Sequence, residues 1–486
     1  MRIMRKYNSP NNILFTTLIV LILALANPMP TNRFAFSSST RSRKLSSRVS
    51  SSQLNHNLKK ADDYVDCVIV GSGPAGLATS IAISKASPSS SVVMFEKDAF
   101  EPKGSTIAIS SSGYKSLKKL HPPLVTKLKD TAVRLTTGVK LEKWTYDKEE
   151  EERKQLVAEN EFLVKRVVKK SIKKMIVKLV SLGSRFVVKF HSWHEVRMYL
   201  KDEADKLHEQ KLSTINDSST TLHEPLVHTN YILTNVRDRN NDDDTQSQEQ
   251  HQHRFELTFQ NTKIGKERKI FSKYLFACDG TMSAVRSKLP NEPQTLLSVN
   301  KSVWRGSAPN YNLNSAIIWR CPANDDTSGR SAAVFPAGGG LGTAWSVISD
   351  IEDGRSKSTE EARARVLKVV ETMNSVDHNP DYDILKQCID GSGTIIENKL
   401  HVRDLDKPWE SAYDGLIYIG DAAHPVRPTG EGLALAFEDA NVLYQLISKF
   451  GLSDATLRKY EDERFLPVKI ISEKVRLQAE SAYKKR

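Results

Sequence analysis

The sequence predicts an α/β fold in which a parallel sheet with flanking helices is interleaved with a second domain built on an antiparallel sheet. Three apolar runs each end in a glycine-containing turn before a helix begins, within residues 64–86, 269–288 and 415–443. Strand–turn–helix units of this kind are typical of parallel sheets. Between the second and third units, residues 296–400 contain short alternating strands rich in aromatic residues, which indicates an antiparallel sheet.

The composition is that of a globular protein with more than one domain. The chain has 486 residues, of which 39% are hydrophobic and 27% charged. The formal net charge is +13, but residues 1–61 contain ten Lys or Arg residues and no Asp or Glu, which leaves +3 for the rest. The basic character therefore belongs mainly to the leader, and this distribution argues against a nucleic acid as partner.

Residues 1–61 predict a bipartite targeting leader. Basic residues precede an apolar run at 13–26, which is short for a membrane span and fits the core of a signal peptide, with Ala24-Leu25-Ala26 as a cleavage site. Residues 27–61 are rich in Ser and Arg, as transit peptides are. A signal peptide followed by a transit-like segment resembles the leaders of plastid proteins in algae whose plastids lie inside extra membranes. Entry into the ER and secretory pathway is the alternative.

The four cysteines, Cys67, Cys278, Cys321 and Cys388, lie far apart in the sequence. This spacing is neither that of a disulfide framework nor that of a metal site. His251 and His253 lie in the polar, low-complexity loop 238–253, where no fixed geometry supports them as ligands. The sequence therefore predicts no metal centre, and it favours a reducing compartment.

The first strand–turn–helix unit contains the pattern G-x-G-x-x-G. A predicted strand at 64–70 leads into Gly71-Ser-Gly73-Pro-Ala-Gly76, and a predicted helix follows. In this context the first glycine makes a tight turn, the second admits a pyrophosphate, and the third lets the helix pack on the strand. Glu96 ends the next predicted strand, twenty residues after Gly76. Its carboxylate can accept hydrogen bonds from both ribose hydroxyls and would repel a 2′-phosphate, so the unit suits FAD or NAD.

The other two units also end in an acidic residue at a glycine turn. Asp279 stands in the sequence ACDGTMSAVR, and Arg286 is placed to hold either Asp279 or a phosphate. Asp421 stands in GDAAHPVRPTGEG, and a helix with one apolar face begins after Gly432. The N-terminus of that helix would direct unpaired N–H groups at an electron-rich ring that becomes anionic on reduction.

Four aromatic residues of the 296–400 block are candidates for a substrate site or for the core. These are Trp304, Trp319, Phe335 and Trp345. The pattern does not decide between the two. A second open question concerns the basic residues of 165–178, which belong to the charge-rich segment 149–178. They form either a solvated edge or a surface for peripheral membrane contact.

The three motifs, in this order, closely resemble the class A flavoprotein monooxygenases, the p-hydroxybenzoate hydroxylase-like family. The resemblance covers residues 64–470 and includes Trp304-Arg-Gly306 and a C-terminal helix around 457–464. It implies a Rossmann-type FAD-binding domain interleaved with an antiparallel-sheet substrate domain. The expected boundaries are a leader at 1–61, the first part of the FAD-binding domain at 62–295 with an insertion at 139–190, the substrate domain at 296–400, the remainder of the FAD-binding domain at 401–447, and C-terminal helices at 448–486.

The resemblance also implies which residues bind FAD. The ADP half would lie against the first motif, and the ribityl chain and isoalloxazine ring against the third. The expected residues are Gly71, Gly73, Pro74, Ala75, Gly76, Glu96, Lys97, Arg197, Asp279, Asp421, Pro428, Gly430, Glu431, Gly432 and Leu433.

Two positions depart from the pattern of the family. The family usually has Arg where this chain has Trp193, and Arg197 stands one helical turn later. The family usually has Gln where this chain has Glu431, so that a carboxylate would lie beside the flavin and oppose an anionic reduced ring.

The expected function is that of an FAD-dependent monooxygenase. NAD(P)H would reduce FAD as a transient co-substrate, and a flavin C4a-hydroperoxide would hydroxylate or epoxidise a small apolar or aromatic substrate. No catalytic side chain is expected, because the cofactor carries the chemistry. The alternatives are a reductase or dehydrogenase of the same fold, and a flavin-binding partner protein without activity. The sequence lacks the Cys-Gly-Gly segment of the plastid geranylgeranyl reductases, and this absence argues against the first alternative.

Overall fold

The computed structural model describes residues 64–483, apart from 103–105, 135–138, 144–188, 216–223, 240–253, 294, 322–329, 351–355, 378, 406–408 and 429. The leader and the basic segment 165–178 lie outside the described residues, as does most of loop 238–253. The described residues all belong to one compact unit, 60–486. Among their helices, none combines the length and apolar character that crossing a membrane would require.

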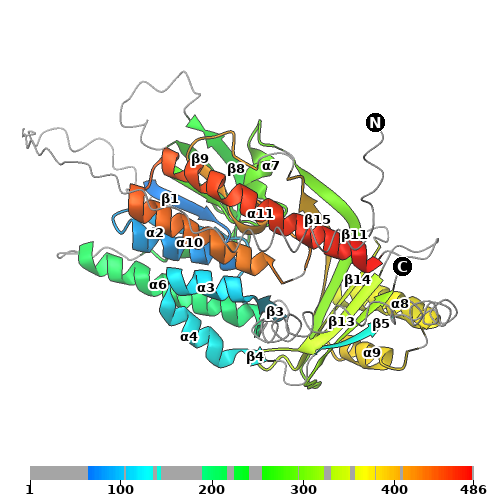
Figure 1. The fold of residues 1–486 in the computed structure, drawn as a ribbon. Coiled ribbons are helices and arrows are strands. Elements are labelled where there is room, and N and C mark those ends of the chain that lie inside the picture. The colour runs from blue at the N-terminus through cyan, green and yellow to red at the C-terminus, as the bar shows by residue number, and fades with distance from the viewer. Residues whose placement is uncertain are drawn as a thin grey trace, which may run out of the picture. The chain divides into compact units, whose positions relative to one another are not determined.

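A seven-stranded sheet carries the three glycine motifs (Figure 1). Its central strand, β1, runs parallel to β2 on one side and to β10 on the other, and β16 runs parallel to the end of β10. Strand β7 extends the sheet beyond β2, and β9 and β8 extend it antiparallel beyond β10. The bounds are β1 (Tyr64–Val70), β2 (Val92–Glu96), β7 (Val227–Thr229), β8 (Tyr231–Asp238), β9 (Phe255–Asn261), β10 (Glu267–Ala277) and β16 (Leu416–Tyr418).

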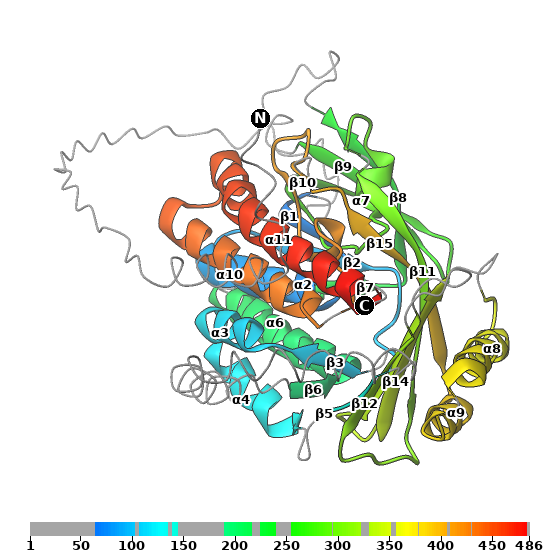
Figure 2. The same cartoon turned by 45° about the vertical axis from the view of Figure 1, so that its right-hand side comes forward.

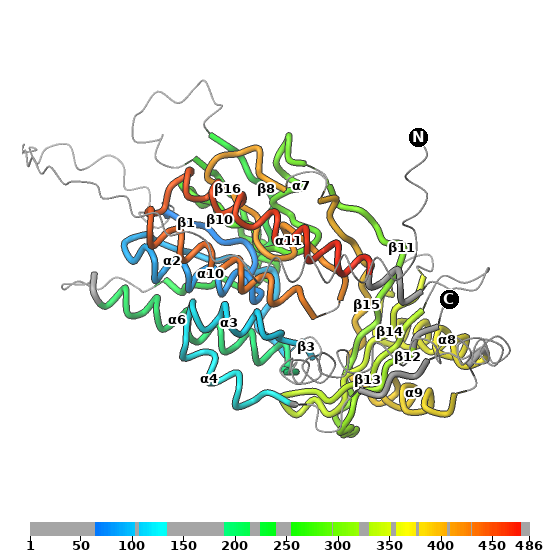
Figure 3. Tube along the Cα trace, in the orientation of Figure 1, coloured from blue at the N-terminus to red at the C-terminus, as the bar shows by residue number. Residues whose placement is uncertain are grey.

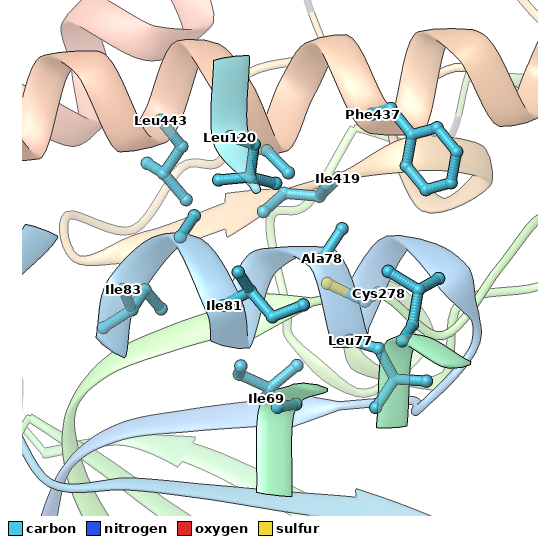
Figure 4. Packing of buried hydrophobic residues seen from close by; sticks show 14 of the residues in the cluster. Ile69, Leu77, Ala78, Ile81, Ile83, Leu120, Cys278, Ile419, Phe437 and Leu443 are labelled. Atoms are coloured by element: carbon cyan, nitrogen blue, oxygen red, sulfur yellow. The ribbon is translucent and has the colours of Figure 1, made fainter. Parts of the chain in front are cut away.

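Two layers of helices cover one face of this sheet. Figure 4 shows α2 between β1 and α10, with Ile69, Ile81 and Phe437 among the packed residues. These side chains are fully buried, so the hydrophobic effect holds the two helices on the sheet. The helices on this side are α2 (Pro74–Ala86), α3 (Ser111–Leu120), α4 (Pro122–Thr131), α6 (Trp193–Ile215) and α10 (Gly432–Phe450).

A second core lies on the opposite face of the same sheet. Phe95 and Phe259 stack with ring centroids 3.8 Å apart, and Val468 of the C-terminal helix reaches this core. The helices here are α7 (Ala284–Lys288) and α11 (Asp454–Tyr483), and the short 3-10 helix η4 (Gly420–Ala422) follows β16.

The second domain is a six-stranded sheet in the order β15-β11-β14-β13-β12-β5, covered on one face by α8 and α9 (Figure 2). Strands β11 and β15 connect it to the first domain along the path traced in Figure 3. The bounds are β5 (Val139–Lys143), β11 (Leu296–Ala308), β12 (Ala316–Cys321), β13 (Arg330–Pro336), β14 (Thr343–Asp350), α8 (Thr359–Asp377), α9 (Tyr382–Asp390) and β15 (Ile395–Arg403).

A three-stranded sheet completes the fold, in the order β3-β6-β4. Its strands are β3 (Thr106–Ile109), β4 (Val133–Arg134) and β6 (Lys189–Ser192), and both neighbours of β6 pair antiparallel with it. This small sheet brings β6 next to the second domain, because Gly338 of the β13–β14 turn packs against the backbone of His191.

The predicted fold class is confirmed. The strand predicted at 64–70 is β1, and the helices predicted after Gly76 and Gly432 are α2 and α10. The sequence reading underestimated some elements, since β11 has 13 residues where a short strand around 303–306 was expected. A long strand whose two halves lie in different packing environments has no single alternation pattern to reveal it.

Candidate functional site

The three motifs meet at one edge of the seven-stranded sheet. Because β1, β2, β10 and β16 are parallel, their carboxyl ends lie side by side. Gly71 follows β1, Glu96 ends β2, Asp279 follows β10, and Asp421 follows β16. In open parallel sheets the crevice outside the carboxyl ends of the strands is where ligands bind. The sheet topology therefore brings together residues that are up to 350 positions apart in the sequence.

The glycine positions of the first motif differ in what surrounds them. Gly71 has a φ of +95°, and a Cβ there would lie 2.5 Å from the carbonyl oxygen of Cys278. A Cβ on Gly76 would lie 2.0 Å from the carbonyl oxygen of Gly71. A Cβ on Gly73 would meet nothing within 4 Å. Gly71 and Gly76 are therefore required by the fold, whereas Gly73 leaves open space in front of the N-terminus of α2.

Glu96 and Arg197 lie together beside the first glycine loop. The backbone N–H and hydroxyl of Ser72 donate hydrogen bonds to Oε2 of Glu96, at 2.8 and 3.0 Å. Nη2 of Arg197 lies 3.1 Å from the same oxygen, and its Nε donates to the carbonyl of Ser72 at 2.9 Å. Burial lowers the pKa of Arg197, while the charge of Glu96 opposes that change.

The replacement of Arg by Trp193 does not leave this loop without a cation. The guanidinium of Arg197 lies 4.0 Å from the ring centroid of Phe100 and 5.3 Å from that of Trp193. Arg197, one turn later on α6, therefore reaches the loop and packs on aromatic rings. Lys97 is exposed next to Glu96, and Pro74 and Ala75 form the first turn of α2.

Asp279 has one satisfied and one unsatisfied carboxylate oxygen. Its Oδ2 accepts a hydrogen bond from the backbone N–H of Val285 at 3.0 Å. Its Oδ1 is buried and has no hydrogen-bond partner within the described part of the chain. Burial raises the pKa of Asp279, and the hydrogen bond from Val285 opposes that change. A buried oxygen of this kind indicates a missing donor, which a bound ligand can supply.

Arg286 does not pair with Asp279. Its Nη1 lies 3.3 Å from Oε2 of Glu292, and its guanidinium stacks 3.5 Å from the ring centroid of Tyr418. Both charged side chains are buried, so this ion pair belongs to the second core. Glu292, which is close in sequence, takes the guanidinium in place of Asp279, and the alternative that Arg286 holds a phosphate stays a prediction.

Asp421 lies at the N-terminus of α10. A Cβ on Gly432 would be 3.7 Å from its Oδ1. Water can reach the carboxylate, but the surrounding protein still raises its pKa by burial, against the effects of His424 and Arg305. Asp421 is therefore open to solvent at the start of α10, within the electrostatic influence of His424 and Arg305.

The loop before α10 carries the remaining third-motif residues. Gly430 has a φ of +89°, and a Cβ there would approach Cβ of Ala108 in β3 to 3.3 Å. Glu431 is the N-cap residue of α10, its side chain makes no capping hydrogen bond, and the first turn of the helix contains no acidic residue. Pro428 is exposed. The side chain of Leu433 packs in the core, so only its backbone can face a ligand.

The residues present fit FAD. Two helices, α2 and α10, direct N-termini without a side-chain cap at this edge of the sheet, where they favour negative charge. The open space at Gly73 suits a pyrophosphate, Glu96 suits a ribose, and the solvent-accessible carboxylate of Asp421 suits the hydroxyls of a ribityl chain. The unpaired Oδ1 of Asp279 is the observation within the protein itself that calls for a further ligand group.

For three of the four aromatic candidates, the structure decides between the two alternatives in favour of the core. Trp304, Trp319 and Trp345 are each 0% exposed. They face α8 and α9, where Trp319 stacks on Tyr382 with centroids 5.4 Å apart and Nε1 of Trp345 donates to Ser392 at 2.8 Å. They are core residues, because strand alternation directs them to the helix-covered face of the sheet.

Phe335, the fourth aromatic candidate, lies on the opposite face. It is half-buried and stacks with Phe190 of β6, with ring centroids 5.2 Å apart. Phe190 is the cross-strand partner of Ala108, so their side chains share one face of the small sheet. Since Ala108 also lies against Gly430, the Phe190–Phe335 pair is next to the loop expected to face the flavin.

Arg305 is a site residue that sequence reasoning missed. It follows Trp304 in β11, and the alternation of the strand directs it away from the core toward Asp421. Burial lowers the pKa of its guanidinium, and the negative charge of Asp421 opposes that change. Strand alternation could have indicated this role, because Arg305 must occupy the face opposite to its neighbour Trp304.

His424 and Asp439 were also missed. Nε2 of His424 lies 2.8 Å from Oδ2 of Asp439, and the same oxygen accepts a hydrogen bond from the backbone N–H of Gly420 at 2.9 Å. Nε of Arg464 in α11 lies 2.6 Å from Oδ1 of Asp439. The sequence did contain a signal for Asp439, because an acidic residue among the apolar residues of the helix after Gly432 needs a buried partner.

Comparison with known proteins identifies the class. The family described as FAD binding domain matches residues 163–473, which is more than half of the chain. The chain belongs to this FAD-binding family. The predicted class A flavoprotein family and the FAD cofactor are therefore confirmed, and with them the prediction of an FAD-dependent oxidoreductase. A comparison with curated protein sequences finds no match.

Solved structures share the fold at low sequence identity. Tetracycline destructase Tet(51) superposes with a TM-score of 0.57 and 13% identity, covering 87% of this chain and 92% of that one. HpxO from Klebsiella pneumoniae, in complex with FAD and uric acid, gives 0.56 and 14%, covering 87% and 89%. PqsL from P. aeruginosa, in complex with 2-aminobenzoylacetate, gives 0.56 and 14%, covering 87% and 97%. These likenesses show the fold alone.

Proposed function

We propose that this protein is a monooxygenase that uses NAD(P)H and O2 to hydroxylate or epoxidise a small apolar or aromatic substrate. The observation that carries the proposal is the Phe190–Phe335 pair beside Gly430 and Ala108. It sets an apolar surface from the second domain against the loop that precedes α10. An oxygen transfer requires a substrate next to the flavin and shielded from water, and an apolar pair beside this loop supports such a position for the substrate.

The roles of the protein are binding, orientation and charge compensation. Gly73, Glu96 and Arg197 would hold the ADP part of FAD, and Asp279 and Asp421 the part between the adenosine and the ring. Bound FAD, once reduced, supplies the activation of O2 and the transfer of one oxygen atom. The N-terminus of α10 and the guanidinium of Arg305 would stabilise negative charge on the reduced ring. Aromatic side chains would hold the substrate by apolar contact.

Three solved structures that share this fold contain small ligands, which supports a small substrate for this chain. One was solved with uric acid, one with 2-aminobenzoylacetate and one with a further substrate. Each of these ligands belongs to its own protein. For this chain, the aromatic pair favours an apolar or aromatic substrate, and a plastid address would favour an isoprenoid, a carotenoid, a quinone or a tetrapyrrole-related compound.

The test is a comparison of NAD(P)H oxidation with and without candidate substrates. Purified protein should show flavin absorption, and a substrate should stimulate both NAD(P)H oxidation and O2 uptake, with product bearing one oxygen from ¹⁸O2. Asp421→Ala should lose FAD on purification and lose this activity. Reduction of a substrate without O2, and without ¹⁸O in the product, would assign the protein to the reductases of this fold instead.

We also propose that residues 1–61 direct the protein to a plastid. The support is the order of the two segments, an apolar run after basic residues and then a Ser- and Arg-rich stretch without acid. The full chain fused to a fluorescent protein should accumulate in the plastid of an alga with complex plastids. Removal of residues 27–61 alone should redirect the fusion to the secretory pathway, and unchanged plastid import would contradict the two-part reading.

A further inference from the structure

The second half of α11 presents three large apolar side chains to solvent. Leu466, Ile470 and Leu477 are 61%, 60% and 52% exposed. With about 100° of rotation per residue, the three positions fall within an arc of about 40°. They form a single stripe along the helix, which we call the α11 stripe. Figures 1 and 2 show α11, in red, on the outside of the fold beside α10.

The stripe is not part of what holds the helix in place. The inward face of α11 is formed by buried side chains, among them Arg464, Val468 and Val475. In the first half of the helix, the outward face carries the exposed polar residues Lys459, Asp462 and Glu463. The outward face therefore changes from polar to apolar near Leu466, although both halves are anchored in the same way. An apolar outer face has a stability cost in water and indicates a partner.

Basic residues border the α11 stripe on both sides. Relative to Leu466, Lys474 lies about 80° to one side, and Lys469 and Arg476 lie about 60° and 80° to the other. Glu473, beside the stripe, forms an ion pair of 2.5 Å with Arg476. From 465 to the end of the chain there are six Lys or Arg residues and two Glu residues, a net charge of +4.

We propose that the α11 stripe docks the protein on the surface of an anionic lipid membrane. An apolar stripe with Lys and Arg along its borders is the pattern of helices that lie in the membrane interface, where the apolar side chains enter the acyl boundary and the cations meet lipid phosphates. A second copy of the chain is a poorer partner, because pairing two such stripes would bring basic borders of like sign together.

Docking through α11 would place the flavin site at a fixed position relative to the membrane. Arg464, two residues before Leu466, points inward and contacts Asp439, which in turn holds the backbone N–H of Gly420. The docking helix is therefore tied to the third motif by buried ionic contacts. The proposal does not depend on the proposed monooxygenase activity, because membrane binding can be measured without turnover.

The experiment is co-sedimentation of the full chain with vesicles of phosphatidylcholine alone or of phosphatidylcholine with phosphatidylglycerol. The test variant replaces Leu466, Ile470 and Leu477 by Ser. The matched control replaces Ile264 and Met282, both 70% exposed elsewhere on the protein, by Ser. All three proteins keep the basic leader, so a difference between them reports on α11. Equal FAD content and melting temperature would show that the test variant is folded.

We expect the unchanged protein to bind phosphatidylglycerol vesicles more tightly than neutral ones, and less tightly as salt is added. The triple Ser variant should bind about 30-fold more weakly, whereas the control variant should match the unchanged protein. Independently, Lys474→Glu should weaken binding to the anionic vesicles about fivefold or more. Each result would support docking through the stripe.

Two outcomes would overturn the proposal. One is equal vesicle binding by the triple Ser variant and the unchanged protein, which would assign any binding to another segment. The other is a dimer in solution that the triple Ser variant makes monomeric without any change in vesicle binding, which would make the stripe an interface between two copies.

Discussion

His424 and Asp439 form a buried contact of 2.8 Å between Nε2 and Oδ2 that joins the third motif to the middle of α10. Both side chains are almost fully buried, and Arg464 of α11 approaches the other oxygen of Asp439. Burial by itself would raise the pKa of Asp439, but its contacts with His424 and Arg464 outweigh that effect and hold the pKa well below its usual range. One carboxylate thus holds together three segments around the cofactor site.

Replacing Asp439 by Asn should therefore destabilise the protein strongly. The change removes the buried counter-charge of Arg464 and leaves it only the partly buried Glu438, and breaking a buried ion pair typically costs about 3–5 kcal/mol. Urea unfolding monitored by fluorescence would measure the loss. The control is Glu438→Gln, because Glu438 is only partly buried and lies 3.3 Å from the same arginine, so its loss should cost at most about 1 kcal/mol. Similar values for the two variants would contradict the role assigned to Asp439.

Replacing Gly76 by Ala should impair folding, whereas replacing Gly73 by Ala should impair FAD binding. Gly76→Ala places a Cβ 2.0 Å from a carbonyl oxygen and should lower the free energy of unfolding by at least about 3 kcal/mol. Gly73 has a φ of −68° and open space around its Cβ position, so Gly73→Ala should fold normally. Its methyl group should instead obstruct the pyrophosphate and weaken FAD binding about tenfold or more, measured by titration of the apoprotein. Unchanged affinity would show that FAD does not approach Gly73.

Glu431→Gln should raise the reduction potential of the bound flavin. The N-cap position of Glu431 puts its carboxylate close to the end of α10 that is expected to stabilise the reduced, anionic ring. Removing a negative charge there favours reduction, and a change of about 1.4 kcal/mol corresponds to about 30 mV for two electrons. A redox titration against reference dyes would measure it. An unchanged potential would show that Glu431 turns away from the ring.

Arg305→Gln should shift the same potential in the opposite direction. Arg305 lies in protein surroundings that lower its pKa by burial, close enough to Asp421 for that charge to oppose the effect. Loss of an enclosed cation disfavours the reduced ring, so the potential should fall by about 30 mV or more. Arg305→Lys, which keeps the charge, is the matched control and should stay near the original value. A fall in both variants would indicate that shape, rather than charge, matters at this position.

Glu461 should make the free energy of unfolding depend on pH. It is 1% exposed, its Oε2 accepts a hydrogen bond from Nη1 of Arg458 at 3.0 Å, and burial raises its pKa from 4.5 to about 7 despite that arginine. Between these pKa values the native state holds a proton that the unfolded chain has lost. The contribution of Glu461 to the free energy of unfolding therefore falls as pH rises from 4.5 to about 7, by about 3 kcal/mol.

Glu461→Gln tests this contribution because it resembles the protonated form at every pH. Denaturant unfolding at about pH 5 and about pH 8 should show the variant gaining up to about 3 kcal/mol on the unchanged protein at the higher pH. Glu463→Gln, an exposed neighbour on the same helix, should show no such gain. A difference between Glu461→Gln and the unchanged protein that is the same at both pH values would refute the raised pKa.

The local parts of the cofactor site could be read from the sequence. Gly71, Glu96, Asp279 and Asp421 each end a short apolar run, and parallel strands require their carboxyl ends to lie at one edge. Arg197 could be proposed, but whether it reached the first loop depended on the packing of α6, which places its guanidinium 2.9 Å from the carbonyl of Ser72. The pairing of His424 with Asp439 depended on the angle between the third motif and α10.

The substrate side could not be read in the same way. Trp304, Trp319 and Trp345 have the same residue type and a similar context as Phe335, yet the sheet sends them into the core and leaves Phe335 near Phe190. The face that a strand turns to the core depends on which helices cover it, and α9 was not recognisable as the cover of these tryptophans. The exposure of the α11 stripe could not be predicted for the same reason, because the sequence of a helix does not show whether another element covers its apolar residues.

The sequence by itself determined the family and the cofactor, and it predicted the edge of the sheet where FAD would bind, because glycine turns and strand-ending acids are local features with fixed geometry. The tertiary structure alone decided which aromatic side chain lies outside the core beside Phe190, which cation acts on Asp421, and which apolar residues stay exposed. Those choices depend on how segments more than a hundred residues apart pack together, as when Asp421 acts on the charge of Arg305 and Phe335 stacks on Phe190. No local pattern encodes which side of an element such a distant segment will cover.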